Sequence, residues 1–309
     1  PTYLTALSQP DTYRLNTLLA DEPLSIKQPN GQLWQPKNYD REFRGRVMLV
    51  DALANSLNVP TVNLGMAVGL NQITETLKRL GIPENVIQPV PAMLLGAISL
   101  TPMEVAQEYQ TIASGGNRAP LSSLRSVIAE DGTVLYQSFP QAERAVPAQA
   151  AYLTLYGMQQ VVERGTSRSL AVKFPNYHLA AKTGTSNDLR DSWFAGIDGK
   201  EVAISWVGRD NNGPAKLTGA NGALTIYRRY LENQTPLPLM LTPPEGITTM
   251  TVDASGNFIC NGSSAGRVLP VWTDNPQALC QASQPQPSAQ QDQQNGEGVA
   301  DWIKQMFGQ

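Results

Sequence analysis

The chain has 309 residues, of which 41% are hydrophobic, so it can bury a sizeable core and form one large domain or two small ones. Its 23 basic and 26 acidic side chains give a net charge of −3, which argues against nucleic-acid binding because such proteins usually carry a basic surplus. No apolar run reaches the length of about 18 residues that a membrane span needs. Since the first residue is proline, we expect a fragment or a processed product whose anchor or export signal lies upstream.

The sequence contains little histidine or cysteine. The single histidine, His178, excludes a histidine-rich metal site, and we expect neither a metal nor a cofactor. A disulfide between the two cysteines, Cys260 and Cys280, would close a loop of about 20 residues and stabilise the fold by roughly 3 kcal/mol. Such a bridge would indicate an oxidising compartment. The alternative is a pair of free thiols.

The first half of the chain is predicted to contain an irregular N-terminal segment, several helices and one hairpin. Residues 1–45 are rich in proline, asparagine and glutamine and are expected to be irregular, except for the tail of a helix at Tyr3–Leu7. Helices further on are indicated by apolar spacing and by capping or stop residues, and an Asp-Gly turn predicts a hairpin. The expected helices cover residues 46–58, 70–80, 101–114 and 147–163, and the hairpin covers residues 124–136.

The second half of the chain is predicted to form a sheet. Short apolar runs predict a three-stranded antiparallel meander that begins near Lys182 and continues over residues 193–208, before a helix at 222–230. Prolines mark a boundary near residue 235. A helix predicted at the C-terminal end, over residues 299–309, could pack on its own domain, lie on a membrane or bind a partner. We expect a main domain at residues 1–235 and a small β-unit at residues 236–280. A disordered Gln-rich linker is expected at residues 281–298 and an amphipathic helix at residues 299–309.

The stretch Lys182-Thr183-Gly184-Thr185 lies between two apolar strand-like runs. A lysine can supply positive charge for a carboxylate, threonine hydroxyls can donate hydrogen bonds, and a glycine lets a substrate backbone approach a strand edge. Such a strand suits acyl chemistry at the end of a peptide. A motif of three residues also recurs by chance, and the structural alternative for the lysine is an exposed strand position.

A second motif, Ser56-Leu57-Asn58, lies at the end of the helix that Pro60 is predicted to stop. The serine hydroxyl could relay a proton and the asparagine amide could hold the amide of a substrate, although both residue types are also common helix caps. These motifs are two of the three elements of the serine acyl-transferases. The third element, a serine followed three positions later by a lysine, occurs nowhere in this sequence.

With both motifs in their local context, the sequence resembles the transpeptidase domain of class A penicillin-binding proteins. The supporting stretches are Arg46–Leu53 before Ser56, Leu100–Ala106, and Arg164-Gly165-Thr166 ahead of Lys182. The resemblance covers nearly the whole chain. It implies an α+β fold of the penicillin-binding and β-lactamase type, with an antiparallel sheet and flanking helices, that is incomplete at its N-terminal side.

The resemblance also implies an activity, the D,D-transpeptidation of peptidoglycan stem peptides that end in D-Ala-D-Ala, with β-lactams as mimics of that end. Ser56 would relay a proton, Asn58 would hold the acyl amide and Lys182 would tune the electrostatics of the site. Thr183 and Thr185 would receive the terminal carboxylate. The backbone N–H of Thr185 would form half of the oxyanion hole.

By the same resemblance, the nucleophilic serine and a glycosyltransferase domain lie upstream of Pro1. They would belong to a longer parent protein, anchored by a single span at the periplasmic face of the inner membrane. We therefore expect the fragment alone to form no adduct with penicillin. Regulators of cell-wall synthesis are expected partners. A non-catalytic interaction module and a β-lactamase-type hydrolase remain as alternatives, which the residues before Pro1 would distinguish.

Overall fold

The structure is a computed structural model that describes residues 1–28, 30–260, 262 and 265–282. The chain divides into two units, Pro1–Asp274 and Asn275–Gln309. In the second unit, the described secondary structure is the helix α9 (Pro276–Ala282). The predicted linker from residue 283 onward and the predicted terminal helix at 299–309 lie outside the described residues.

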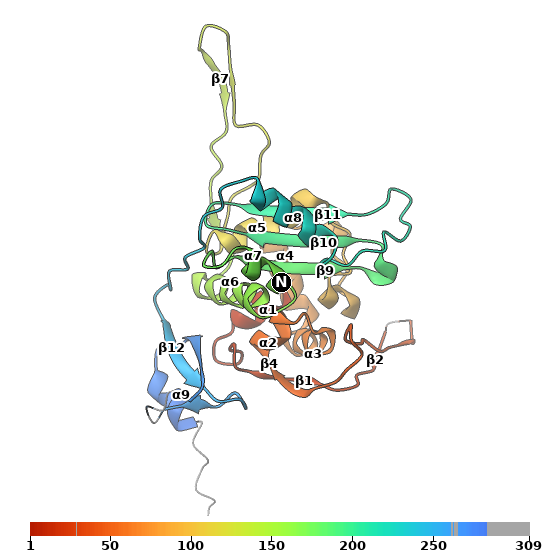
Figure 1. Cartoon of the computed structure of the whole chain (residues 1–309), viewed down its shortest axis with the longest axis vertical. Helices are drawn as coiled ribbons and strands as arrows, with labels where there is room; N and C mark the ends of the chain where they lie inside the picture. The colour runs from red at the N-terminus through yellow and green to blue at the C-terminus, as the bar shows by residue number, and fades with distance from the viewer. Residues whose placement is uncertain (29, 261, 263–264, 283–309) are drawn as a thin grey trace, which may run out of the picture. The chain divides into compact units, whose positions relative to one another are not determined.

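The first unit contains helices and short strands, which follow one another along the chain mostly in runs of one kind (Figure 1). Its helical segments are α1 (Thr2–Leu7), α2 (Leu49–Ala54), α3 (Asn58–Val68), α4 (Leu70–Arg79), η1 (Glu84–Val86), η2 (Pro91–Leu95), α5 (Pro102–Ala113), α6 (Ala148–Glu163), α7 (Arg168–Lys173), η3 (Asn187–Leu189) and α8 (Ala223–Glu232). Its strands are β1 (Leu18–Asp21), β2 (Ile26–Lys27), β3 (Leu33–Trp34), β4 (Gly45–Met48), β5 (Asn117–Arg118), β6 (Ser126–Ile128), β7 (Val134–Gln137), β8 (Glu143–Arg144), β9 (Ala180–Thr185), β10 (Ser192–Ile197), β11 (Val202–Val207), β12 (Ile247–Val252), β13 (Phe258–Ile259) and β14 (Arg267–Trp272).

The predicted three-stranded meander is confirmed, as an antiparallel sheet with the strand order β11-β10-β9. Lys182 on β9 pairs with Ala195 on β10. Because side chains alternate along a strand, Lys182 lies on one face of the sheet, whereas Thr183 and Thr185 lie on the other. Because β9 is the last strand in the order of this sheet, side chains from both of its faces can meet at its edge.

Helices cover both faces of this sheet (Figure 1). On the face that carries Lys182, Ala180 packs with apolar residues of α6, among them Leu155. On the opposite face, Phe194 packs against α8, and its ring centroid lies 5.1 Å from that of Tyr227. Full burial of a large apolar side chain stabilises a fold by about 1.5–3 kcal/mol, so both layers hold β9 firmly in place.

A further apolar cluster lies among α1, α2, α3 and α4. Val252 of β12 and Leu269 of β14 are fully buried in the same cluster. These strands form a small antiparallel sheet in the order β13-β12-β14. The third strand, β14, was not predicted, because Pro270 interrupts its apolar run; a proline is tolerated there because β14 is not the central strand. The domain boundary at residue 235 stays a prediction.

The predicted helix over residues 46–58 is wrong in its extent. The chain first forms β4, which pairs with β1, and then two separate helices, α2 and α3, on either side of Ser56. Pro60 does not end a helix, because it lies in the first turn of α3, where a missing N–H costs no intrahelical bond. The prediction of irregular structure over residues 1–45 is likewise wrong where β1, β2 and β3 form.

Elements with strong local signals are confirmed, including α4, α5, α6, α8 and the hairpin of β6 and β7. The predicted helix start at residue 101 is confirmed by a capping box: Glu104 N–H donates to Thr101 Oγ1, and Thr101 N–H donates to a Glu104 carboxylate oxygen. The hairpin extends away from the rest of the first unit (Figure 1). Its strands are exposed along their whole length.

Candidate active site

Ser56 occupies the turn between α2 and α3. Its φ of 54° lies in the left-handed region, where a residue with a Cβ is strained by about 1–2 kcal/mol. Backbone hydrogen bonds fix the turn, since the N–H of Ser56 donates to Leu53 O at 3.2 Å and the N–H of Leu57 donates to Ala52 O at 2.9 Å. The hydroxyl is therefore presented from a tight turn and not from a regular helix.

Asn58 is the first residue of α3. Its side-chain Nδ2 donates a hydrogen bond to the carbonyl oxygen of Lys37 at 2.8 Å. That bond fixes the orientation of the amide and leaves Oδ1 as its acceptor end. An acceptor in this position can bind the N–H of a peptide. Lys37 was missed because it lies in the segment that was expected to be irregular.

Lys182 reaches across from β9 to the turn that carries Ser56. Its Nζ donates to Ser56 Oγ at 2.7 Å and to the carbonyl oxygen of Thr183 at 2.9 Å. Burial lowers the pKa of Lys182 to about 8, because the ammonium loses part of its hydration. The two sequence motifs therefore meet through one hydrogen bond, with a lysine that is charged at neutral pH but close to giving up its proton.

The hydroxyl groups of Thr183 and Thr185 each form a hydrogen bond with another residue of the protein. Thr183 Oγ1 lies 2.9 Å from Thr166 Oγ1, and the backbone N–H of Gly219 donates to Thr185 Oγ1 at 3.0 Å. A hydroxyl oxygen that accepts a hydrogen bond keeps its own proton for a different acceptor. With Thr166 as the donor to Thr183, both hydroxyls can donate to an anion such as a carboxylate.

Gly184 lies between these threonines, and a second glycine approaches it closely. A Cβ at Gly219 would lie 2.7 Å from the carbonyl oxygen of Gly184 and 2.8 Å from its nitrogen. Only a residue without a side chain lets this loop approach β9 closely enough to bond Thr185. Gly219 had no signal in the sequence, whereas Thr166 lies in a stretch that supports the family resemblance.

The single histidine and the two cysteines have partners of their own. Within the described residues, no group of three or more His, Cys, Asp and Glu side chains could hold a metal ion, and no helix there has the length and apolar character to cross a membrane. His178 is half-exposed, with Nδ1 3.9 Å from a Glu163 carboxylate oxygen. Cys260 and Cys280 are both disulfide-bonded.

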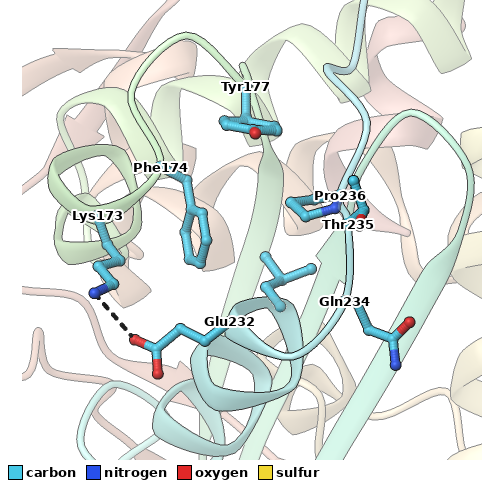
Figure 2. Close-up of a pocket in the computed structure, with 8 residues that line it drawn as sticks. Lys173, Phe174, Tyr177, Glu232, Gln234, Thr235 and Pro236 are labelled. Carbon is cyan, nitrogen blue, oxygen red and sulfur yellow. Dashed lines mark ion pairs between the residues drawn. The ribbon is translucent and has the colours of Figure 1, made fainter.

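A hollow of about 500 Å³ is lined by none of the predicted site residues. Figure 2 shows the residues that line it. In it the rings of Phe174 and Tyr177 meet edge to face at 6.1 Å, and Lys173 pairs with Glu232 at 3.5 Å. The lining is completed by Leu231, Gln234, Thr235 and Pro236. The hollow offers apolar surface and one neutralised ion pair, and neither supplies a nucleophile or a proton relay.

Two family profiles match the sequence. The profile described as penicillin binding protein transpeptidase domain matches residues 1–223. The profile described as penicillin-binding protein 1B, C-terminal domain, matches residues 246–284. Together they cover the described sheet, the site and the small sheet of β12 to β14.

Similar proteins include penicillin-binding proteins 1B of two bacteria. That of Escherichia coli (strain K12) is 65% identical over 99% of this chain and 39% of its own length. That of Vibrio cholerae is 50% identical over 99% of this chain and 38% of its own length. The chain thus spans less than half the length of these relatives.

Solved structures show the same fold. Penicillin-binding protein 1A from Haemophilus influenzae matches with a TM-score of 0.79 at 24% identity, over 88% of this chain and 46% of its own. Penicillin-binding protein A from M. tuberculosis, in its imipenem acyl-enzyme complex, matches with a TM-score of 0.62 at 22% identity, over 75% of this chain and 58% of its own. These likenesses confirm the predicted α+β fold.

Proposed function

Because this chain belongs to the penicillin-binding-protein transpeptidase family, we propose that its parent protein, the longer protein that contains it, is a serine D,D-transpeptidase. The proposed enzyme cross-links peptidoglycan stem peptides that end in D-Ala-D-Ala, and β-lactams acylate it. The observation that carries the proposal is the 2.7 Å bond from Lys182 Nζ to Ser56 Oγ, which joins the two motifs of this chain.

In this proposal, Ser56 and Lys182 handle the proton. The Ser56 oxygen accepts a hydrogen bond from Lys182, so its own proton is available to a leaving amine, and it can take up another proton in exchange. The positive charge of Lys182 favours a carboxylate ligand and stabilises negative charge that develops nearby. Asn58 binds the amide of the acyl group through Oδ1.

Thr183 and Thr185 donate their hydroxyl protons to the terminal carboxylate, because their hydroxyl oxygens accept hydrogen bonds from Thr166 and Gly219. Gly184 keeps this part of the β9 edge open to the substrate backbone. The N–H of Thr185 serves as one oxyanion-hole donor, and loss of one such donor typically slows catalysis by about 100- to 1000-fold.

The nucleophile is proposed to come from outside this chain. None of its serines is followed three positions later by a lysine, and that lysine is the base that would activate a serine in this family. The parent protein would supply the serine from a segment that precedes Pro1. This chain by itself would then bind a β-lactam without forming a covalent bond to it.

The cellular setting is proposed from the relatives, which are penicillin-binding proteins 1B. The parent protein would carry a glycosyltransferase domain upstream and a membrane anchor, and this domain would lie at the periplasmic face of the inner membrane. Regulators of cell-wall synthesis would be its protein partners. An oxidising periplasm is consistent with two disulfide-bonded cysteines.

Labelled benzylpenicillin tests the proposal directly. We expect one covalent label per parent protein, located by mass spectrometry on a serine before Pro1 that a lysine follows three positions later. We expect no label on the isolated chain. Ser56→Ala and Lys182→Ala in the parent protein should slow labelling by at least about 100-fold, whereas Ser122→Ala, in an exposed loop, should not.

Each other result points to a different function. A label on a serine of the isolated chain would contradict the missing nucleophile. Rapid release of the label with repeated turnover would indicate a hydrolase of the β-lactamase type. A parent protein that takes up no label would be a non-catalytic interaction module.

A further inference from the structure

The backbone of Gly165 lies directly against the end of α2. A Cβ at this position would lie 1.9 Å from the carbonyl oxygen of Ala54 and 2.7 Å from its carbonyl carbon. Both atoms are backbone, so no change of rotamer could relieve the clash. The next residue uses this proximity, because Thr166 N–H donates to the same Ala54 oxygen at 3.2 Å.

Ala54 is fully buried and lies two residues before Ser56. Its carbonyl oxygen belongs to the last turn of α2, where carbonyl groups lack a partner within the helix. The bond from Thr166 therefore satisfies the end of α2 and holds it at the point where the chain enters the left-handed turn of Ser56. The corner at Gly165 and Thr166 is thus a support for the turn.

The same corner also contacts β9. Thr166 Oγ1 lies 2.9 Å from Thr183 Oγ1, so one residue bonds the serine turn through its backbone and the lysine strand through its side chain. Lys182, which neighbours Thr183, closes the loop by its bond to Ser56. The corner and the lysine are two independent connections between the same two segments.

We infer that Gly165 and Thr166 are positioning residues, which set the separation between Ser56 and β9 and orient the Thr183 hydroxyl toward a substrate carboxylate. This inference rests on the proposed function. With Thr166 as the donor, the Thr183 proton can point only at another acceptor. Without that donor, the Thr183 hydroxyl is free to rotate, and its hydrogen bond to a carboxylate weakens.

A comparison of two ligands isolates this effect. In the parent protein we would measure the acylation rate constant for benzylpenicillin and for its methyl ester, which lacks the carboxylate charge. Thr166→Val should lower the preference for the carboxylate over the ester about tenfold, the effect of losing one hydrogen bond to a charged group. Thr166→Ser, which keeps the hydroxyl, should restore the preference.

The control is Thr154→Val. The Thr154 hydroxyl is buried on α6 and donates to Ala150 O at 2.8 Å, so the variant loses a comparable group away from the site. It should leave the preference unchanged. A purely structural role for Thr166 would change the rates for both ligands equally, and an unchanged ratio in Thr166→Val would overturn the inference.

The role of Gly165 has a separate test. Gly165→Ala should slow acylation by both ligands at least about tenfold, because the added Cβ displaces the turn of Ser56 from β9. Gly213→Ala, whose Cβ would meet only side-chain atoms, is the matched control. Wild-type rates at Gly165→Ala would contradict the support of the turn. If the wild-type parent protein takes up neither ligand, the proposed function fails; if it takes them up but the ratio does not change in Thr166→Val, only this inference fails.

Discussion

Lys182 Nζ donates a 2.7 Å hydrogen bond to Ser56 Oγ, although the two residues are 126 positions apart. The lysine comes from the edge of a sheet and the serine from a strained turn between two helices. Their contact places a cation of lowered pKa beside a hydroxyl, and the pH dependence of the site should follow from it.

The rate constant for acylation by a ligand with a carboxylate should fall as the pH rises through about 8. Burial lowers the pKa of Lys182 to this value, so the ammonium is charged below it and neutral above it, and the attraction for the anion is lost on the alkaline side. The measurement is the acylation rate constant for benzylpenicillin in the parent protein at pH values on both sides of the transition.

Lys182→Met should flatten the alkaline limb of that profile, since it removes the charge and keeps a chain of similar length. Lys200→Met, in an exposed turn, is the control and should leave the limb in place. An alkaline limb of wild-type shape in Lys182→Met would assign the titration to another group.

Ser56→Gly and Ser56→Ala should differ in stability but not in activity. Both remove the hydroxyl, so both should lose acylation to the same extent. Glycine adopts the left-handed conformation of residue 56 without strain, so Ser56→Gly should be more stable than Ser56→Ala by about 1 kcal/mol. The measurement is the thermal unfolding of this domain without ligand, in the transition that bound benzylpenicillin raises in the wild-type parent protein. Equal stability of the two variants would mean that the turn relaxes in solution.

The sequence predicted those parts of the fold that depend on neighbours along the chain. The capping box of Thr101 and Glu104 lies within one helical turn, and the Asp-Gly turn fixes the hairpin locally. The turn at Ser56 was not predicted, because the residues from 46 to 58 are apolar enough for one continuous helix. What divides them is pairing of β4 with β1 and packing against distant residues.

The candidate site was predictable in its motif residues and not in their partners. Ser56, Asn58 and Lys182 carry recognisable chemistry in their side chains. Lys37 acts through its carbonyl oxygen, a group that every residue has, so the residue type at this position gives no signal. Gly219 must be a glycine because its loop approaches β9 closely, and the sequence alone does not show that approach. Thr166 was predicted only as part of a supporting stretch, because its bond to Thr183 depends on how α6 packs against β9.

Cys260 and Cys280 should form a disulfide with each other. Both are disulfide-bonded in the structure, and the sequence holds no other cysteine. Titration of the denatured, unreduced chain should find no free thiol, and titration after reduction should find two. Reduction should lower the free energy of unfolding by roughly 3 kcal/mol, because it removes a constraint on the unfolded chain. Free thiols before reduction would contradict the bridge.

Apolar residues of the hairpin formed by β6 and β7 should contribute little to stability. The Leu135 side chain is 65% exposed, so it has little burial to lose. Leu135→Ser should change the free energy of unfolding by less than about 0.5 kcal/mol. Leu155→Ala is the contrast: that side chain is 4% exposed between α6 and the sheet, and its loss should cost about 2–5 kcal/mol. Both changes in the free energy of unfolding are measured in the parent protein, in the unfolding transition that bound benzylpenicillin raises. A loss of more than about 1 kcal/mol in Leu135→Ser would show that the hairpin packs against another surface in the parent protein.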